Sequence, residues 1–198
     1  MFRVTEDVSL LNKGFAQVHV TSPLTHARIA QMAGKKYFTK FDMPDSYWQL
    51  PCSARMTSIY AFSTPWGTYE WCERLPMGDR NVPAFMTNVM AQVLAGLEEF
   101  SSSYIDDIFI FSDTAEEHVE HVYRVLERLN AHNFKVRTDK SEVGVEKIGA
   151  LGFDVDATGY RPFTTQIQKF LEAPFPTAEQ LRCWMGLLNV FRFFLPRL

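Results

Sequence analysis

The sequence has few cysteines and no long apolar run. Its three cysteines are widely spaced and form no C-x-x-C pair, so neither a disulfide framework nor a zinc site is indicated, and a reducing compartment is expected. No segment approaches the roughly 20 apolar residues that cross a bilayer, and the first residues lack the basic and apolar regions of a signal peptide. We therefore expect a soluble protein without a membrane partner.

Net charge and glycine content are also low. The net charge is −3, but residues 1–60 and 161–198 each carry +3, whereas residues 61–160 carry −9. An acidic centre between basic ends suits a metal site between surfaces that hold a polyanion, although charge alone favours ordinary solvated faces. The ten glycines include no cluster that would cradle a phosphate, since Gly149 and Gly152 are too few.

Hydrophobic residues make up 46% of the chain, which is ample for the core of one large domain or two small lobes. Helical and strand patterns are mixed, with hairpins as well as crossovers, and this order predicts an α+β fold in which helices cover an antiparallel sheet. The expected helices lie within residues 22–36, 82–99, 113–130 and 177–196, and the expected strands within residues 36–43, 58–71, 101–112, 136–144 and 148–155.

The helix expected over residues 113–130 has the clearest pattern. Thr114 and Glu117 match a capping box at its start. His118 and His121 stand three residues apart, a spacing compatible with shared metal ligation, but their charged neighbours predict surface histidines. The apolar stripe that would face the core consists of Val119, Val122, Leu126 and Leu129.

Two adjacent aspartates, Asp106 and Asp107, interrupt the β-prone run SSSYIDDIFIFS of residues 101–112. Adjacent aspartates suit a tight turn, because their short side chains hydrogen-bond nearby backbone groups. The flanking apolar residues, however, predict strands buried on both faces, and ionised carboxylates taken out of water need partners such as a divalent cation. The dipeptide alone favours the turn.

A third carboxylate, that of Asp42, makes the cation site more favourable relative to the plain turn. Asp42 ends another strand-like run, so two strands of one sheet would bring Asp42 beside Asp106 and Asp107 if they were neighbours. Three carboxylates at one sheet edge suit two metal ions about 3.5–4 Å apart, one activating an attacking hydroxyl and the other stabilising the leaving oxygen of a phosphoryl transfer. Composition does not show whether the strands are adjacent.

Several ordered blocks of the chain resemble the reverse transcriptase of gypsy-type long-terminal-repeat retrotransposons and, more distantly, the retroviral enzymes. The block around that family's first catalytic aspartate is similar to YFTKFDMPDSYWQLP, and its template and nucleotide-binding block is similar to WGTYEWCERLPMGDRNVPAFM. Its Y-x-D-D hairpin and following helix are similar to YIDDIFIFSDTAEEHVEHVYRVLERL. Its primer grip and the stretch leading out of the thumb are similar to LGFDVDATGYRP and TAEQLRCWMGLLNVFRFFLP. Such a set at matching spacing is far more specific than Y-x-D-D alone.

The resemblance implies a polymerase palm-type antiparallel sheet with partial fingers and thumb. The implied regions are partial fingers at residues 1–36, a palm at residues 37–156 with a fingers and palm nucleotide-binding block at residues 61–100, and the start of the thumb or connection at residues 157–198. The implied activity is that of an RNA-directed DNA polymerase domain of a retrotransposon polyprotein, which transfers deoxynucleotides to a primer 3′-hydroxyl with two Mg²⁺ ions, or with Mn²⁺ in their place. The implied partners are an RNA or DNA template with its primer, deoxynucleoside triphosphates, and other polyprotein segments such as RNase H. The implied location is intracellular, in a cytoplasmic particle or the nucleus.

The family motifs also imply roles for single residues. The catalytic and metal-binding residues would be Asp42, Asp106 and Asp107. Tyr104 would support the hairpin, and Ile105 would lie near the primer terminus. The ring of Tyr47 would crowd the sugar 2′ position and favour deoxynucleotides; the alternative interpretation is a plain core aromatic. The remaining substrate-binding residues would be Arg3, Asp45, Ser46 and Met77.

Four positions depart from the family pattern. Met77 stands where the family usually has Phe or Gln, Thr87 where it has Gln, Ser46 where it has Gly, and Ser9 where it has Arg. The changed Met77 and Thr87 favour an alternative function, that of a degenerate or host-adopted module that binds nucleic acid or protein without polymerising. The three intact aspartates favour the enzyme.

Overall fold

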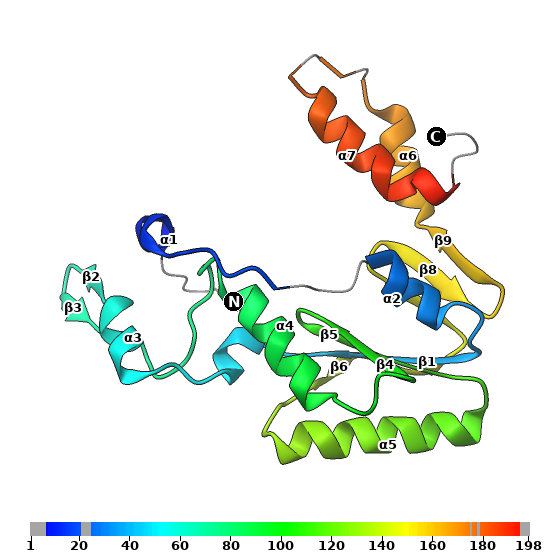
Figure 1. Cartoon of the computed structure of the whole chain (residues 1–198), viewed down its shortest axis with the longest axis horizontal. Helices are drawn as coiled ribbons and strands as arrows, with labels where there is room; N and C mark the ends of the chain where they lie inside the picture. The colour runs from blue at the N-terminus through cyan, green and yellow to red at the C-terminus, as the bar shows by residue number, and fades with distance from the viewer. Residues whose placement is uncertain (1–6, 21–24, 175, 178, 195–198) are drawn as a thin grey trace.

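The computed structural model describes residues 7–20, 25–174, 176–177 and 179–194. Its centre is a sheet with the strand order β4-β5-β1-β6, with helices above and below it (Figure 1). Neighbouring strands in this sheet are antiparallel, and the predicted α+β class is confirmed. In the described part of the chain, no helix is long and apolar enough to cross a bilayer. The strands are β4 (Ser101–Tyr104), β5 (Asp107–Ser112), β1 (Tyr37–Asp42) and β6 (Arg137–Val145).

The side chains of each strand alternate between the two faces of this sheet, and each face has its own core. Phe41 and Ile108 are buried on one face, where α4 and α5 pack. Phe38 and Phe109 are buried on the other face, against α2 and a second sheet. The helices that cover the sheet are α2 (Thr25–Met32), α4 (Val82–Val93) and α5 (Ala115–Ala131).

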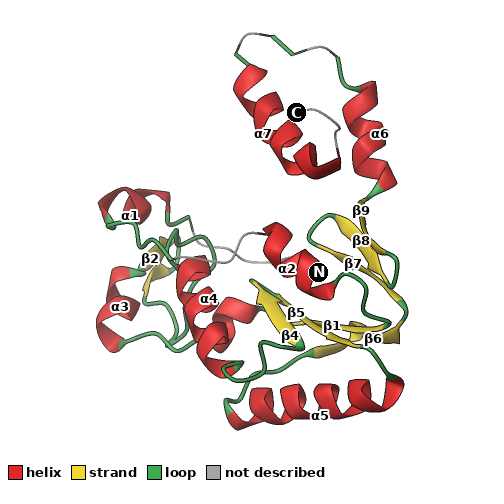
Figure 2. Cartoon of the chain, turned by 45° about the vertical axis from the view of Figure 1, so that its right-hand side comes forward, coloured by secondary structure: helices red, strands yellow, loops and turns green. Residues whose placement is uncertain are grey.

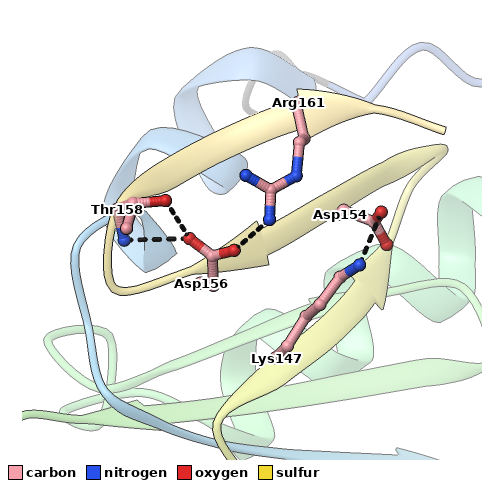
Figure 3. A network of polar contacts seen from close by, with 5 residues as sticks. All are labelled: Lys147, Asp154, Asp156, Thr158 and Arg161. Atoms are coloured by element: carbon pink, nitrogen blue, oxygen red, sulfur yellow. Dashed lines mark hydrogen bonds and ion pairs between the residues drawn. The ribbon is translucent and has the colours of Figure 1, made fainter. Parts of the chain in front are cut away.

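The second sheet is antiparallel, and charged side chains link its strands (Figure 3). Lys147 Nζ lies 2.8 Å from Asp154 Oδ2 on the neighbouring strand, and Arg161 pairs with Asp156 across the next hairpin. Thr158 donates to Asp156 through its hydroxyl (2.5 Å) and its backbone N–H (2.9 Å), and these bonds hold the pKa of Asp156 below its usual value. The strands are β7 (Lys147–Ala150), β8 (Phe153–Asp156) and β9 (Gly159–Pro162).

The helix α4 is shorter than expected. The sequence predicts a helix over residues 82–99, but α4 ends at Val93 and the chain continues in turns to Phe100. Gly96 has a φ of 82°, a left-handed conformation that does not continue a right-handed helix. Leu94 and Leu97 are nevertheless buried, because the turns pack them into the same core as the helix.

The helix α5 has the predicted cap but not the predicted buried stripe. The backbone N–H of Glu117 donates to Thr114 Oγ1 at 3.3 Å, as a capping box requires. Val119 is 72% exposed and Leu126 is 37% exposed, so the stripe prediction is wrong at these two positions. The side chains that α5 buries are His118, Val125 and Leu129.

The interpretation of His118 and His121 as surface histidines is also wrong. His118 is only 4% exposed; its Nε2 lies 2.8 Å from Thr39 Oγ1 and its Nδ1 lies 2.9 Å from Ser112 Oγ. His121 Nδ1 lies 2.8 Å from the same Ser112 hydroxyl, and its ring stacks on Phe100 with centroids 3.8 Å apart. Burial lowers the pKa of both imidazoles. These polar contacts turn His118, rather than Val119, toward the sheet.

Smaller elements lie to either side of the central sheet (Figures 1 and 2). One side holds α1 (Ser9–Gly14), α3 (Ala54–Ile59) and the hairpin of β2 (Phe62–Thr64) and β3 (Gly67–Tyr69), which confirms the two strands expected within residues 58–71. Beyond β9 come α6 (Thr164–Glu172), which the sequence patterns missed, α7 (Leu181–Phe191) and η2 (Arg192–Phe194). The last helix begins later than expected, and its expected end at Pro196 lies outside the described residues.

Candidate active site

The three aspartates singled out by the sequence meet at one end of the central sheet. Asp42 is the last residue of β1 and Asp107 is the first residue of β5, and the two are direct cross-strand partners. The backbone N–H of Met43 donates to the carbonyl oxygen of Asp106 at 2.9 Å, which holds the third aspartate beside them. The pairing of β1 with β5 therefore supplies the adjacency that composition left open.

Asp106 lies in a two-residue turn. Tyr104 pairs with Asp107 across the β4–β5 hairpin, so Ile105 and Asp106 form its connection. Ile105 has a φ of 52°, which is a genuine outlier for a β-branched residue, since such conformations cost of the order of 1–3 kcal/mol. The prediction of a turn is thus right for Asp106, whereas Asp107 belongs to the strand.

The carboxylate of Asp107 is paired with a lysine. Lys40 Nζ lies 3.0 Å from Asp107 Oδ2, and the Asp107 side chain is 26% exposed. Burial raises the pKa of Asp107, and the hydrogen bond and charge of Lys40 oppose this rise. The neighbouring carboxylates of Asp42 and Asp106 raise the pKa of Asp107 further. This end of the sheet therefore holds more negative charge than the lysine alone neutralises.

The carboxylate of Asp106 accepts a hydrogen bond from the hydroxyl of Ser46 at 2.5 Å. Ser46 is buried and begins the short 3₁₀ helix η1 (Ser46–Gln49). It follows Asp45, whose φ of 46° and ψ of 46° place it in the left-handed region. The stretch expected to face the nucleotide thus turns sharply next to the aspartates.

The residue types at this end of the sheet fit a hard divalent cation. Carboxylate oxygens are the protein ligands that Mg²⁺ prefers, and a cation would relieve the like-charge repulsion that adds to burial in raising the pKa of Asp107. In the described ranges, no group of three or more His, Cys, Asp and Glu side chains is arranged to hold a metal ion. Two of the three carboxylates instead face Lys40 and Ser46. The backbone therefore brings the aspartates together, while these two side chains contact protein partners.

Two tyrosines border the carboxylates. Tyr47 is half-buried in η1, packs against the core that lies between the central sheet and α4, and has its pKa raised first by burial and then by Asp106 and Tyr104. Tyr104 ends β4 and is 40% exposed. The packing of Tyr47 shows that it is a core aromatic, and the charge of Asp106 acts on its hydroxyl.

The other residues singled out by the comparison with the family motifs are more scattered. Met77 is partly buried in a turn with Gly78, whose carbonyl oxygen accepts a hydrogen bond from the Asn12 side chain at 2.9 Å. Thr87 lies in α4, where its hydroxyl donates to the carbonyl oxygen of Pro83 at 2.9 Å. Arg3 lies outside the described residues.

Sequence reasoning missed Lys40 and Arg28. Lys40 stands two residues before Asp42, and this period places both side chains on one face of a strand, so the spacing was a usable signal. Arg28 is buried, donates to Ser102 Oγ at 3.0 Å, and lines a cavity of about 270 Å³ between α2, α4 and β4. Its position in the middle of a segment expected to be helical was its only sequence signal.

Comparison with known proteins gives a consistent family match. Residues 3–155 match the family described as reverse transcriptase (RNA-dependent DNA polymerase). The chain is 29% identical over 193 residues to Polyprotein P3 of Commelina yellow mottle virus, covering 96% of this chain and 10% of that polyprotein. It is 30% identical over 197 residues to the retrovirus-related Pol polyprotein from transposon 297 of Drosophila melanogaster, covering 98% of this chain and 18% of that protein.

Solved structures give the same match. The foamy viral protease-reverse transcriptase in complex with double-stranded DNA superimposes with a TM-score of 0.86 and 26% identity, covering 98% of this chain and 34% of that one. A second structure of the foamy viral enzyme, in complex with an RNA/DNA hybrid, gives a TM-score of 0.78 and 25% identity. The chain thus spans between a tenth and about a third of the length of these relatives.

Proposed function

The chain belongs to the reverse transcriptase (RNA-dependent DNA polymerase) family, and we propose that it extends a primer 3′-hydroxyl with deoxynucleotides, as a polymerase domain of the kind found in gypsy-type retrotransposon polyproteins. In this proposal residues 1–36 are partial fingers, residues 37–156 are the palm, and residues 157–198 begin the thumb or connection. An RNA or DNA template with its primer would be the macromolecular partner, and further polyprotein segments such as RNase H would be additional partners.

One observation carries the proposal. Asp42 and Asp107 are cross-strand partners, and the Asp106 turn lies directly beside them. Burial raises the pKa of Asp107 first, and the neighbouring carboxylates of Asp42 and Asp106 raise it further, so the cluster is an unfavourable arrangement for a fold that gains nothing from it. Perturbed carboxylates of this kind concentrate at functional sites.

Asp42, Asp106 and Asp107 would hold the two Mg²⁺ ions, or Mn²⁺ in their place. When bound, the metal would favour the deprotonated primer hydroxyl and stabilise charge on the leaving pyrophosphate. The protein's own contribution is positional, because the β1–β5 pairing and the strained Ile105 turn fix the backbone of all three ligands before substrate arrives.

The remaining site residues would bind the nucleotide and the primer. We assign Asp45, Ser46 and Arg3 to the triphosphate, Met77 to the nucleotide-binding block, and Tyr104 with Ile105 to the primer end. Tyr47 would exclude the ribose 2′-hydroxyl by shape, because a ring held in place by core packing leaves room for hydrogen only.

A second candidate function is that of a module that keeps the fold without polymerising. The observation in its favour is the hydroxyl of Ser46, a residue that replaces the glycine of the family pattern and donates directly to Asp106. A bond of this kind competes with a metal for the carboxylate. The two functions differ in whether the chain incorporates nucleotides.

Primer extension on poly(rA)/oligo(dT) with Mg²⁺ tests the proposal. We expect incorporation by the wild type and none by Asp106→Asn, with unchanged far-ultraviolet circular dichroism. Asp113→Asn is the matched control, because Asp113 pairs with Lys35 at the opposite end of β5 and lies outside the proposed site. No incorporation by the wild type would favour the non-polymerising module. Equal incorporation by the wild type and Asp106→Asn would show that the metal assignment is wrong.

The sugar selectivity of Tyr47 is tested by comparing deoxynucleotide and ribonucleotide incorporation by the wild type and Tyr47→Val. We expect the variant to accept ribonucleotides at least about tenfold better, because losing a steric block worth 1–3 kcal/mol changes selectivity by that order. Equal discrimination by both proteins would mean that Tyr47 serves the core alone.

A further inference from the structure

Lys40 forms an ion pair with Asp107 of the carboxylate cluster. It lies on β1 two residues before Asp42 and directly opposite Phe109 of β5, so its side chain emerges on the same face as Asp42 and Asp107. Its ammonium group is 3.0 Å from Asp107 Oδ2 and 5.7 Å from the centroid of the Phe109 ring. The Lys40 side chain is 24% exposed. Lys40 therefore lies at the boundary between the apolar core and the carboxylates.

A second basic residue nearby has a different partner. Arg137 is opposite Asp42 on β6, but its guanidinium makes two bonds to Asp139, at 3.2 Å and 3.0 Å. These bonds are the first cause of the raised pKa of Arg137, and Asp42 contributes less. Lys40, by contrast, is bonded to a member of the cluster itself.

We propose that Lys40 is a positioning residue that holds Asp107 in a metal-free arrangement and must release it when a divalent cation binds, so that Lys40 sets the metal affinity of the site. This inference rests on the proposed function, because it needs the aspartates to be metal ligands. The physical reason is that an ammonium and a divalent cation repel each other strongly at contact distance in a half-buried site. Asp107 Oδ2 would have to exchange the ammonium group of Lys40 for the divalent cation.

The proposal makes stability and metal affinity move in opposite directions. Without metal, Lys40 Nζ lies 3.0 Å from Asp107 Oδ2 and neutralises part of the carboxylate cluster, so removing its charge should lower stability. With metal, removing the Lys40 charge also removes its competition with the cation for Asp107, so metal binding should tighten. A lysine that merely supported the fold would give weaker or unchanged metal binding when removed.

The test is a titration of the purified chain with Mn²⁺, in which electron paramagnetic resonance measures free Mn²⁺, alongside thermal unfolding with and without the ion. Lys40→Met keeps the length of the aliphatic stem and removes the charge. We expect its dissociation constant for Mn²⁺ to fall about three- to tenfold, since pairs of this exposure contribute modestly. We also expect a lower Tm without metal and a larger rise in Tm on adding Mn²⁺. Lys40→Arg should bind Mn²⁺ as the wild type does, and Lys40→Gln serves as the charge-removing variant if Lys40→Met does not fold.

Lys35→Met is the matched control. Lys35 pairs with Asp113 at 2.6 Å, but it lies at the opposite end of β1, roughly 20 Å along the strand from Asp42. This distance exceeds the screening length of about 8 Å at physiological ionic strength. The control removes one positive charge and one ion pair, so it should leave the Mn²⁺ affinity unchanged.

Asp106→Asn separates the two ways in which the idea can fail. If Asp106→Asn binds Mn²⁺ as the wild type does, the metal site is wrong and both the proposed function and the role of Lys40 are rejected. If Asp106→Asn binds more weakly while Lys40→Met is unchanged or weaker, the metal site stands and only the role of Lys40 is rejected.

Discussion

β1 and β5 form one antiparallel pair, and its two ends differ in how they treat polar side chains. At one end, Asp42 and Asp107 face each other across the strands beside the strained turn at Ile105. At the other end, Ser112 joins His118 and His121 through hydrogen bonds of 2.9 and 2.8 Å, respectively. The carboxylate end combines like charges, whereas the histidine end pairs neutral donors with neutral acceptors.

The two ends show two kinds of buried polar group: the histidines stabilise the fold through matched hydrogen bonds, whereas the carboxylates are proposed to bind a metal. Buried polar atoms with partners of matched geometry cost little, and losing one partner costs the desolvation of the other. Burial raises the pKa of Asp107 but lowers the pKa of His118, so both groups are pushed toward their neutral forms. The histidines are satisfied in that form, whereas a metal site needs Asp107 ionised.

Asp42→Asn and Ser112→Ala should show the largest contrast between the two ends. We expect Asp42→Asn to reduce primer extension roughly a thousandfold or more without loss of stability, because metal ions supply several kcal/mol of transition-state stabilisation. Ser112→Ala should retain extension but lose about 1–3 kcal/mol of unfolding free energy, since it leaves two imidazole nitrogens without their hydroxyl partner. Extension rates and urea unfolding curves measure both. Comparable primer extension by the two variants would mean that the two ends of the strand pair do not differ in function.

The pH dependence of stability should come from the histidine end. Because burial lowers the pKa of His118 and His121, the folded state binds fewer protons than the unfolded state below about pH 6.5. Stability should therefore be complete above pH 6.5 and fall as the pH drops toward 5, by at most about 1.4 kcal/mol per pH unit for each histidine. Thermal unfolding from pH 5 to 8 measures the slope, and His118→Gln should flatten it. An identical slope in the variant would mean that other groups cause it.

Asp107→Asn should stabilise the chain in the absence of metal. The raised pKa of Asp107 means that its ionised form is disfavoured in the folded state, so its contribution to stability is present below about pH 3.8 and is lost as the pH rises through the folded pKa. We expect the variant to gain about 2–4 °C in Tm at pH 7, which corresponds to about 1 kcal/mol in a chain of this size, and to gain nothing near pH 3. Asp113→Asn, at the opposite end, should show no such gain. A lower Tm for Asp107→Asn at pH 7 would show that the Lys40 pair outweighs burial and repulsion.

Ile105→Gly should have the smallest effect. Glycine adopts a φ of 52° without strain, but it also loses more backbone entropy on folding, so the two contributions of about 1 kcal/mol each nearly cancel. Chemical denaturation should give an unfolding free energy within about 1 kcal/mol of the wild type. A loss of more than 2 kcal/mol would mean that the Ile105 side chain is held by packing rather than forced into its conformation by the turn.

Sequence patterns anticipated much of the fold because they are local. The strands around Phe38 and Phe109 follow from runs of apolar and β-prone residues, and the start of α5 follows from Thr114 and its capping partner. The patterns failed where contacts between distant parts of the chain outweighed local periodicity. Val119 fits a helical apolar stripe, yet the hydrogen bonds of His118 to Thr39 and Ser112 rotate α5 and leave Val119 in solvent.

The same division applies to the candidate site. The sequence by itself determined which residues carry carboxylates, that Asp42 ends a strand, and that Asp106 and Asp107 lie within a second β-prone run, because residue type and alternation are properties of the local chain. Only the tertiary structure decided that Asp42 pairs with Asp107, that Lys40 reaches across to the same carboxylate, and that Ser46 bonds to Asp106. Strand partners and their register are set by which faces the whole core can bury together, and a period of two residues tells a side chain's face but not its neighbour.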